Sequence, residues 1–523
     1  MSQRPTGNAR RRYGAVPAAP LKSRRCRSTF SMMKRTFLLF WAIVAVAVCW
    51  RLDPVDRPLT GDNQLYFYLA ERAASGVPPH VSHVDTKNQL GTLITATAIA
   101  SGRGAGVDDV LASRVASIAF AAVSVVLAAE LATLLAGSVA AGHVAAVALL
   151  AARGVAEHAA TGNNVKIFLV VFVLLAHVAM ARGANRRPAW DVLAGAAAGA
   201  AFLCWQPALL VLGAIVLEAL LERGGVRRAL TLLGAAMLPV VAYEAYFAMH
   251  GALAEQIRQA YVMTLGSVHA PARLPNSLAF VLTEARGLSS PIRIGPLSFA
   301  LLAVAFLVRA ARTRGRALAL LTSRAGLLSF WIGGAAATAF TLYDHQGVPD
   351  LFFPDAYFAV AAGVLAALVA RAAGHSGRME SRYATALVAG VFGVALVWQI
   401  QRDAALRRIP HFSLADQRRA AALVSGYHAS SASVWAYGAV HLLGLAHLDN
   451  HVPYGLFFDD VESVLRADTY LPLKDGRMPE WILQSRRPLP GAAAYLAQGY
   501  DEVTTEVFEA QAVTVWQRRP TAF

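Results

Sequence analysis

The stretch that decides the fold covers residues 60–93 and reads TGDNQLYFYLAERAASGVPPHVSHVDTKNQLGTL. Asp62 follows Gly61 directly, and the run YFYLAERAASG predicts a short helix that ends near Gly76. Further along, the cluster HVDTKNQL places polar side chains at alternate positions, so in an extended segment they would all point the same way. This polar and aromatic stretch lies within a chain that is otherwise strongly apolar.

The composition indicates a polytopic α-helical membrane protein. The 523 residues are 56% hydrophobic and only 15% charged, whereas soluble proteins carry about 25% charged residues. The formal net charge is +16, but the basic residues form short clusters between apolar runs. They predict membrane topology and contact with the lipid bilayer, with no nucleic-acid partner. The three cysteines predict neither a disulfide nor a metal site.

Apolar segments predict about eleven transmembrane helices. They lie near residues 34–51, 114–136, 138–155, 165–182, 190–207, 207–222, 229–249, 296–311, 324–342, 355–371 and 383–400. Segment 88–101 is short for a span. If it does not cross, the basic clusters around 182–187, 223–228, 309–324 and 371–382 all share the side of the basic N-terminus. We therefore expect 88–101 to lie at the outer surface.

This threading divides the chain into three parts. Residues 1–33 predict a basic, disordered cytoplasmic tail, and 34–401 a transmembrane domain whose first outer loop is 52–113. Residues 402–523 have ordinary charge density and the strand-like runs SASVWAYG, PEWILQS and AVTVWQ, which predict a small extracytoplasmic α/β or α+β domain. The expected location is the inner cell membrane.

Asp62 and Lys87 are the candidates for chemistry in the first outer loop. Asp62 fits a general base that takes a proton from an attacking hydroxyl or amine, although an acid at a helix start is also a common N-cap. Lys87 fits a phosphate contact beside His83 and Asp85, although it could equally snorkel to lipid headgroups.

Two further outer stretches contain polar residues next to apolar spans. ARGVAEHAATGNNVKIF supplies Glu157, His158, Asn164 and Lys166, and YDHQGVPDLFFPDAYF supplies Asp344, His345, Asp350 and Asp355. Charges this close to hydrocarbon are costly, so they indicate function, with headgroup anchoring as the alternative. Motifs of soluble nucleotide and hydrolase chemistry do not stand out.

The pattern resembles the GT-C glycosyltransferases of the protein O-mannosyltransferase and lipid A aminoarabinose transferase type. The resemblance covers roughly residues 36–400. It is carried by a first span, Gly61-Asp62-Asn63, Tyr66, the helix end from Ala70 to Pro79, and Asp85-Thr86-Lys87. The late stretch PDLFFPDAYFAVAAG is similar to an aromatic-rich span of that family.

The resemblance implies a polyprenyl-phosphate sugar donor, an extracytoplasmic acceptor, inversion of the sugar configuration and Asp62 as the catalytic acid. The expected substrate contacts are Tyr66, His83, Asp85, Lys87, Glu157, Asn164 and His345. No cofactor is expected, and metal dependence stays open. The sequence departs from the family pattern at Asn63 and Asn164, where acids are usual, and lacks the usual proline after Lys87.

Two rival functions stay open at this point. A transporter or lipid flippase would need polar residues within its spans, and Glu130, Glu218 and Glu244 are the candidates. A non-catalytic homologue acting in an assembly would fit the two asparagine replacements.

Overall fold

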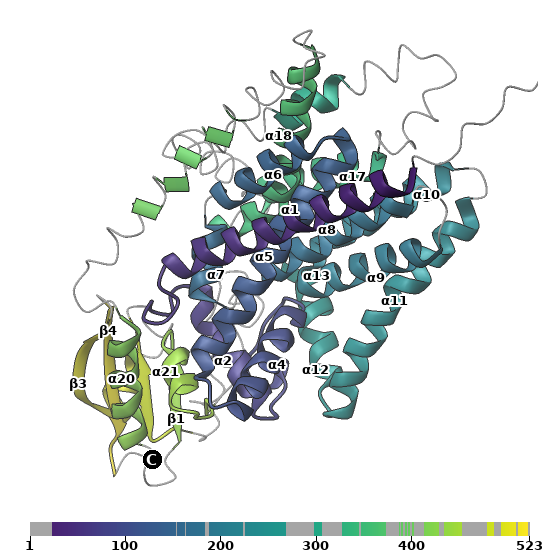
Figure 1. The fold of residues 1–523 in the computed structure, drawn as a ribbon. Coiled ribbons are helices and arrows are strands. Elements are labelled where there is room, and N and C mark those ends of the chain that lie inside the picture. Colours follow the sequence, from purple (N-terminus) through teal and green to yellow (C-terminus); the bar gives the residue numbers. More distant parts are fainter. Residues whose placement is uncertain are drawn as a thin grey trace, which may run out of the picture.

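A computed structural model of the chain describes most of the sequence. The described residues are 23–152, 154–162, 164–183, 188–222, 225–267, 298–305, 327–344, 347–372, 386, 389–390, 393–394, 396–397, 400–401, 413–427, 433–451, 478–485, 493–508 and 511–520. The fold has a long helical bundle with a small sheet at one end, which we call the sheet end (Figure 1).

The bundle is built from apolar helices. They are α1 (Ser23–Arg51), α5 (Asp109–Ala136), α6 (Val139–Ala151), α7 (Val155–Thr161), α8 (Val165–Gly183), α9 (Pro188–Cys204), α10 (Leu209–Leu221), α11 (Gly225–Met249), α17 (Leu328–Tyr343) and α18 (Phe352–Ala372). Four segments in the described part of the chain are long and apolar enough to cross a membrane, or five if the bent pair α6–α7 is one span. Shorter apolar helices cover 36–51, 188–204, 206–221 and 328–343.

These helices coincide with predicted spans, so the prediction of a polytopic membrane protein agrees with the structure. The count of about eleven stays a prediction, because 296–311 and 383–400 lie largely outside the described residues. One boundary differs, since α1 already begins at Ser23 and thus extends into the segment 1–33 that was expected to be disordered. A helix that continues from a span into its basic flank keeps the backbone hydrogen bonded where it leaves the lipid.

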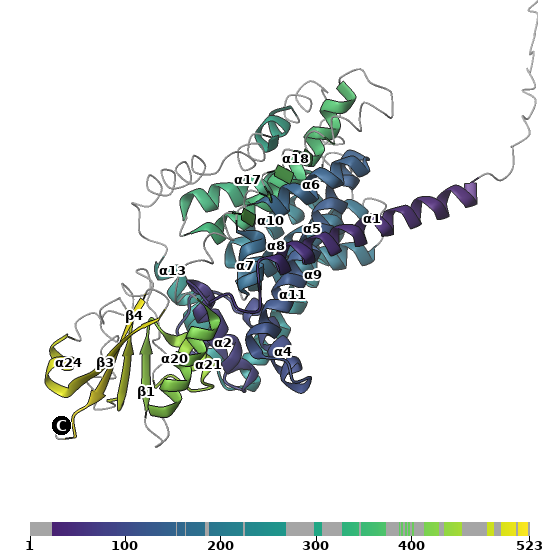
Figure 2. The ribbon, with the colours of Figure 1, turned by 60° about the vertical axis from the view of Figure 1, so that its left-hand side comes forward.

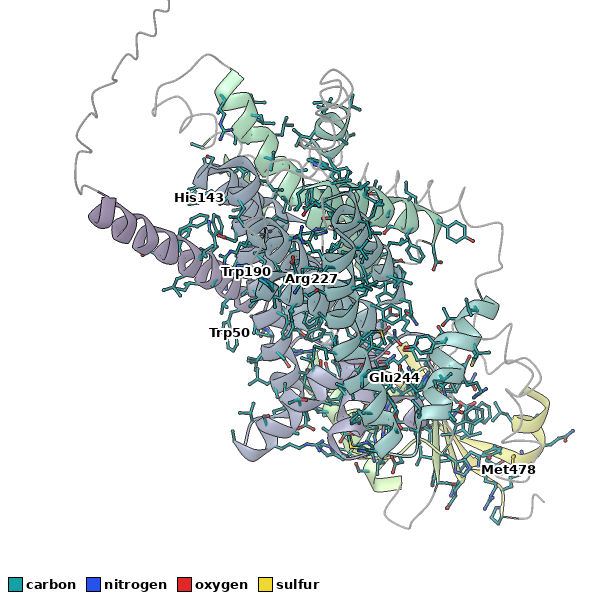
Figure 3. The ribbon with its side chains drawn as sticks, turned by 90° about the vertical axis from the view of Figure 1, so that its right-hand side faces the viewer. Trp50, His143, Trp190, Arg227, Glu244 and Met478 are labelled. Carbon is teal, nitrogen blue, oxygen red and sulfur yellow. The ribbon has the colours of Figure 1, made fainter. Side chains whose placement is uncertain are left out.

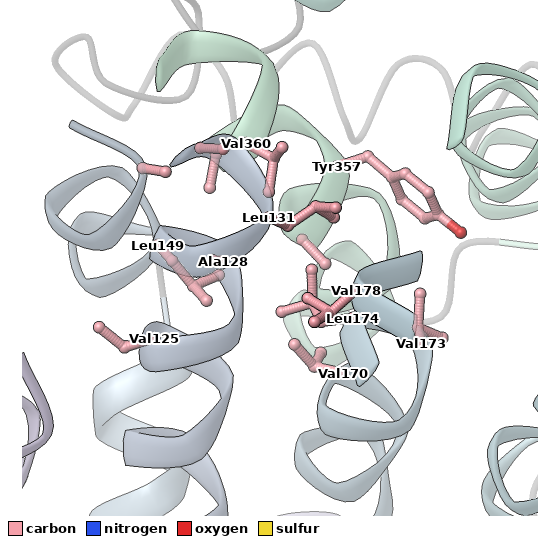
Figure 4. Packing of buried hydrophobic residues seen from close by; sticks show 14 of the residues in the cluster. Val125, Ala128, Leu131, Leu149, Val170, Val173, Leu174, Val178, Tyr357 and Val360 are labelled. Carbon is pink, nitrogen blue, oxygen red and sulfur yellow. The ribbon is translucent and has the colours of Figure 1, made fainter. Parts of the chain in front are cut away.

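The centre of the bundle is packed from small and branched side chains on α5, α6, α8 and α18, including Val125, Leu149, Val173 and Val360 (Figure 4). Close helix contacts depend on glycine. A Cβ added to Gly195 or Gly199 of α9 would lie 2.2 Å from a backbone oxygen of α11. Small residues four apart therefore bring these two helices together, as is common between membrane helices.

Several short helices lie at the sheet end of the bundle (Figure 1). They are α2 (Asp62–Ala74), α3 (Pro79–Ser82), α4 (Leu90–Gly104), α12 (Leu253–Ile257), the π-helix η2 (Arg258–Met263) and α13 (Thr264–Ser267). In both ribbon views α2 and α4 lie at the sheet end of the bundle (Figures 1 and 2). Helix α4 covers the segment 88–101 from Leu90 onward and packs on α2 and α5. This placement fits the expectation that the segment does not cross.

The C-terminal unit, residues 413–520, contains a mixed four-stranded sheet. Its elements are α20 (Leu414–Tyr427), β1 (Val434–Tyr437), α21 (Val440–Leu445), β2 (Trp481–Gln484), α24 (Ala493–Gly499), β3 (Tyr500–Phe508) and β4 (Gln511–Arg518). The strand order is β1-β2-β4-β3, with β1 and β2 parallel and the other pairs antiparallel. All three strand-like runs seen in the sequence are strands.

Candidate functional site

Asp62 is the first residue of helix α2. Gly61 occupies the N-cap position with φ +55°, a conformation that favours glycine, and the helix start has no side-chain cap. The carboxylate of Asp62 therefore does not serve as the N-cap that the sequence allowed as an alternative. It is half-buried and lies in the first turn of α2, at the positive end of the helix dipole.

Lys87 lies close to Asp62 and Tyr66. Its Nζ donates a hydrogen bond of 3.3 Å to the Tyr66 hydroxyl. Burial by itself would lower the pKa of Lys87, but Tyr66, Asp62, Asp85 and Asp350 raise it well above the ordinary value. Lys87 is thus a firmly charged ammonium, and it is only half-buried. Burial raises the pKa of Tyr66 strongly, so Tyr66 is a neutral phenol whose own proton can still be donated.

The backbone around Lys87 is held from several sides. Asp85 is buried, and its two carboxylate oxygens accept from the Lys87 amide at 3.0 Å and the Gln89 side chain at 2.7 Å. The Thr86 carbonyl accepts from Gln206 at 2.7 Å and from Thr264 at 2.6 Å. Segments far apart in the sequence thus fix the position of Lys87.

The side chain of Asp85 turns back onto its own loop, where it accepts hydrogen bonds from the Lys87 amide and the Gln89 side chain. Burial raises the pKa of its carboxyl group. His83 is also buried. The three alternate residues do not form one open face, because His83 and Asp85 are buried and the chain bends at residues 86–87.

A buried ion pair lies next to this cluster. Lys166, at the start of α8, contacts Asp350 of the 3₁₀ helix η3 (Val348–Leu351), and both are almost fully buried. The Lys166 Nζ also lies 4.3 Å from the centre of the Trp205 ring. Asp350 also helps to raise the pKa of Lys87. Lys87 and Lys166 therefore belong to one electrostatic cluster.

The remaining predicted contacts have structural partners. Glu157 on α7 forms an ion pair of 2.5 Å with Arg57. The side-chain oxygen of Asn164 accepts from the Lys166 amide at 3.0 Å and so caps α8. Asn63 donates to the Thr161 hydroxyl at 2.8 Å. His345 lies outside the described residues.

One group in the described part of the chain has the spacing of metal ligands, namely Glu71, Asp109 and His447. A guanidinium nitrogen of Arg103 lies 2.6 Å from both Glu71 and Asp109. Because a cationic side chain already occupies the space between the two carboxylates, we assign no metal there. These residues instead join α2, α4 and α5 to the C-terminal unit.

Comparison with known proteins supports the fold. A family model described as dolichyl-phosphate-mannose-protein mannosyltransferase matches residues 105–247. ArnT from Cupriavidus metallidurans, solved with undecaprenyl phosphate bound, is 15% identical with a TM-score of 0.51, over 92% of this chain and 98% of that one. No curated protein sequence matches significantly.

Two further structures are similar to the chain at lower scores. The archaeal oligosaccharyltransferase AglB from Archaeoglobus fulgidus is 13% identical with a TM-score of 0.47, over 86% of this chain and 69% of that one. The S. cerevisiae protein O-mannosyltransferase Pmt1-Pmt2 complex is 14% identical with a TM-score of 0.34, over 42% and 34%. The resemblance to GT-C glycosyltransferases seen in the sequence is confirmed at the level of the fold.

Lys166 and Asp350 were absent from the set of residues expected to contact substrates. The sequence shows both as charged residues at the ends of apolar spans. It does not indicate that they form a pair, because 184 positions separate them.

Proposed function

We propose that this chain is a membrane glycosyltransferase that moves a sugar from a polyprenyl-phosphate carrier to an acceptor outside the cytoplasm. The observation that carries the proposal is that an acid that does not cap its helix, Asp62, lies near enough to the half-buried Lys87 to help keep it charged. The fold shared with ArnT, a structure with undecaprenyl phosphate bound, and the mannosyltransferase family model support it.

The reaction assigned to this site is a single displacement. The acceptor atom attacks the anomeric carbon while Asp62 takes its proton, and the bond from that carbon to the phosphate oxygen breaks. Polyprenyl phosphate leaves with the bonding electrons, and the Lys87 ammonium stabilises its charge, with Tyr66 able to donate a further hydrogen bond. One displacement inverts the configuration of the sugar.

The sheet end of the bundle is proposed to face away from the cytoplasm. Arg182, Arg228 and Arg371 lie in or beside the predicted cytoplasmic connections. They contact Glu130, Asp191 and the Ala136 carbonyl, respectively. Basic residues are enriched in cytoplasmic loops, which leaves Asp62, Lys87 and the C-terminal unit on the other side.

The acids on which a transporter would depend have structural partners. Glu130 pairs with Arg182 at 2.8 Å, and Glu218 accepts from the Ser329 amide at the start of α17 at 2.6 Å. Glu244 accepts from the Tyr261 hydroxyl at 2.9 Å near the sheet end of α11. Three acids that each serve a local contact do not favour a polar path through the bundle.

A non-catalytic role is not favoured by the two asparagines. Asn63 and Asn164 both make the structural hydrogen bonds described above, and neither replaces Asp62 or Lys87. The departures from the family pattern therefore leave the proposed base and phosphate contact in place.

The function is tested with the full chain in vesicles that contain a panel of undecaprenyl- and dolichyl-phosphate sugars. We expect release of the sugar from the carrier for at least one donor, measured as free polyprenyl phosphate. A parallel assay follows movement of a fluorescent polyprenyl phosphate between leaflets. Lipid movement without consumption of any donor would contradict the transferase assignment and favour a lipid flippase.

A further inference from the structure

A second polar cluster lies near the C-terminal end of α11. Figure 3 shows Glu244 toward the end of the bundle where Met478 of the C-terminal unit lies. The Tyr261 hydroxyl donates to Glu244 at 2.9 Å, and the Gln256 side chain donates to the same oxygen at 3.4 Å. The Tyr261 hydroxyl also contacts the side-chain amides of Gln256 and Asn88. These four residues form what we call the Glu244 cluster.

The cluster has an excess of hydrogen-bond acceptors. Three buried oxygens have no hydrogen-bond donor among the described residues, namely Glu244 Oε2, Gln256 Oε1 and Asn88 Oδ1. Gln256 and Asn88 are fully buried, whereas Glu244 and Tyr261 are half-buried, so the cluster can be reached at its edge. An unpaired buried acceptor destabilises the folded protein, which favours an occupant that donates hydrogen bonds.

Turning the amides over does not remove this excess. The Asn88 nitrogen donates to the Phe202 carbonyl at 3.1 Å, and the Gln256 nitrogen donates to the Glu244 carboxylate. Exchanging nitrogen and oxygen in either amide would bring two acceptors together, so the surroundings fix both orientations. Within the described residues, no lysine, arginine or histidine forms an ion pair with Glu244.

The surroundings of the cluster are apolar and exposed. Val241 and Met249 on α11, together with Val262 and Leu265 beside Tyr261, are between 61% and 78% exposed. In a membrane protein such side chains face lipid. A ligand that reaches Glu244 from this side comes from the bilayer, at the level where a span ends and headgroups begin.

We propose that the Glu244 cluster binds the primary ammonium group of a lipid headgroup, as in an ethanolamine phospholipid. A primary ammonium carries one positive charge and three N–H donors. It therefore matches the three oxygens that lack donors, one of which belongs to the negatively charged Glu244 carboxylate. Asn88 follows Lys87 directly in the chain, but the cluster contains neither Asp62 nor Lys87. Lipid binding there is measured without the transfer reaction, so the proposal does not depend on that reaction.

The test uses the full chain in detergent with four lipids that have the same acyl chains and differ only in methylation of the headgroup nitrogen. These are phosphatidylethanolamine, its monomethyl and dimethyl forms, and phosphatidylcholine. Methylation removes N–H donors stepwise but keeps the positive charge. We expect phosphatidylethanolamine to bind about ten-fold more tightly than phosphatidylcholine, with the methylated forms between them. Lipid binding is measured by native mass spectrometry.

The variant Glu244→Gln should lose this preference and still fold, because its amide supplies donors to the cluster. Glu222→Gln is the matched control, since Glu222 pairs with Arg228 at the far end of the bundle, and it should keep the preference. Equal binding of all four lipids would overturn the proposal, as would a preference unchanged in Glu244→Gln. Binding of free ethanolamine as tight as that of the lipid, or selective binding of Ca²⁺ or Mg²⁺ at this cluster, would also contradict it.

Discussion

Lys87 carries the positive charge next to the proposed base. Asp62, Asp85 and Asp350 keep it protonated in spite of burial, and its backbone is fixed by Asp85 and by contacts to Thr86. A charge held in place before the substrate arrives needs no reorganisation during the reaction, which is the main source of electrostatic catalysis.

Replacing Lys87 by methionine should therefore lower kcat/KM about 100-fold or more, because the leaving phosphate loses its cationic contact. Lys87→Arg keeps the charge and should recover part of the activity. The measurement is the initial rate of sugar release in vesicles. A wild-type rate in Lys87→Met would show that Lys87 does not contribute to the reaction.

His80 makes stability depend on pH. It is buried, its Nδ1 donates to Gln259 at 3.0 Å, and burial lowers its pKa to about 4. In the unfolded chain His80 binds a proton at a higher pH than in the folded one. The stability that neutral His80 contributes is therefore complete above about pH 6.5, and about 3 kcal/mol of it is lost as the pH falls to 4. We expect the unfolding temperature of the wild type to fall between pH 6.5 and pH 4, and this fall should be smaller in His80→Gln. The exposed His250→Gln should keep it, and an unchanged slope in His80→Gln would contradict the assignment.

At the scale of helices and strands, the contact of α9 with α11 depends on two glycines. Gly195→Leu would place side-chain atoms where the Leu232 carbonyl now lies. We expect a loss of about 2–3 kcal/mol in stability, seen as a lower unfolding temperature in detergent. Gly213→Leu on α10, where a Cβ meets nothing within 4 Å, is the control. Equal effects of both changes would show that this contact is not tight.

The sequence was sufficient to predict the described apolar helices, the strands β1, β2 and β4, and the place of Asp62 at a helix start, because these depend on local periodicity and on glycine and proline signals. It did not predict β3 (Tyr500–Phe508). It did not reveal the partner of Lys166 or the inward turn of Asp85. The Lys166 pair joins residues that are distant in the sequence. The direction of the Asp85 side chain depends on a local bend, which the alternation of polar residues does not show. The chemical role of each predicted site residue stays a prediction.

In the whole molecule, the C-terminal unit is attached to the segment that precedes Asp62. The buried side chain of Gln417 donates to the Leu59 carbonyl at 2.8 Å and accepts from the Leu59 amide at 2.9 Å. Gln417→Leu should leave the Leu59 amide unpaired, while the Leu59 carbonyl keeps only the Gln64 side chain at 3.0 Å. We expect it to lower stability by about 1–3 kcal/mol and to reduce activity by loosening the start of α2. Thermal unfolding and sugar release check this, with the exposed Gln498→Leu as the control. Unchanged unfolding and activity would show that the attachment does not matter.

The most direct test of the account compares the binding and the turnover of a polyprenyl-phosphate sugar in the wild type and in Asp62→Asn. Asp53→Asn, the same change in the same loop at a residue with φ +59° that asparagine also adopts, is the matched control. We predict that Asp62→Asn still binds the donor but loses sugar release about 1000-fold, while Asp53→Asn behaves like the wild type. Sugar release at the wild-type rate in Asp62→Asn would contradict the central claim that Asp62 is the catalytic base.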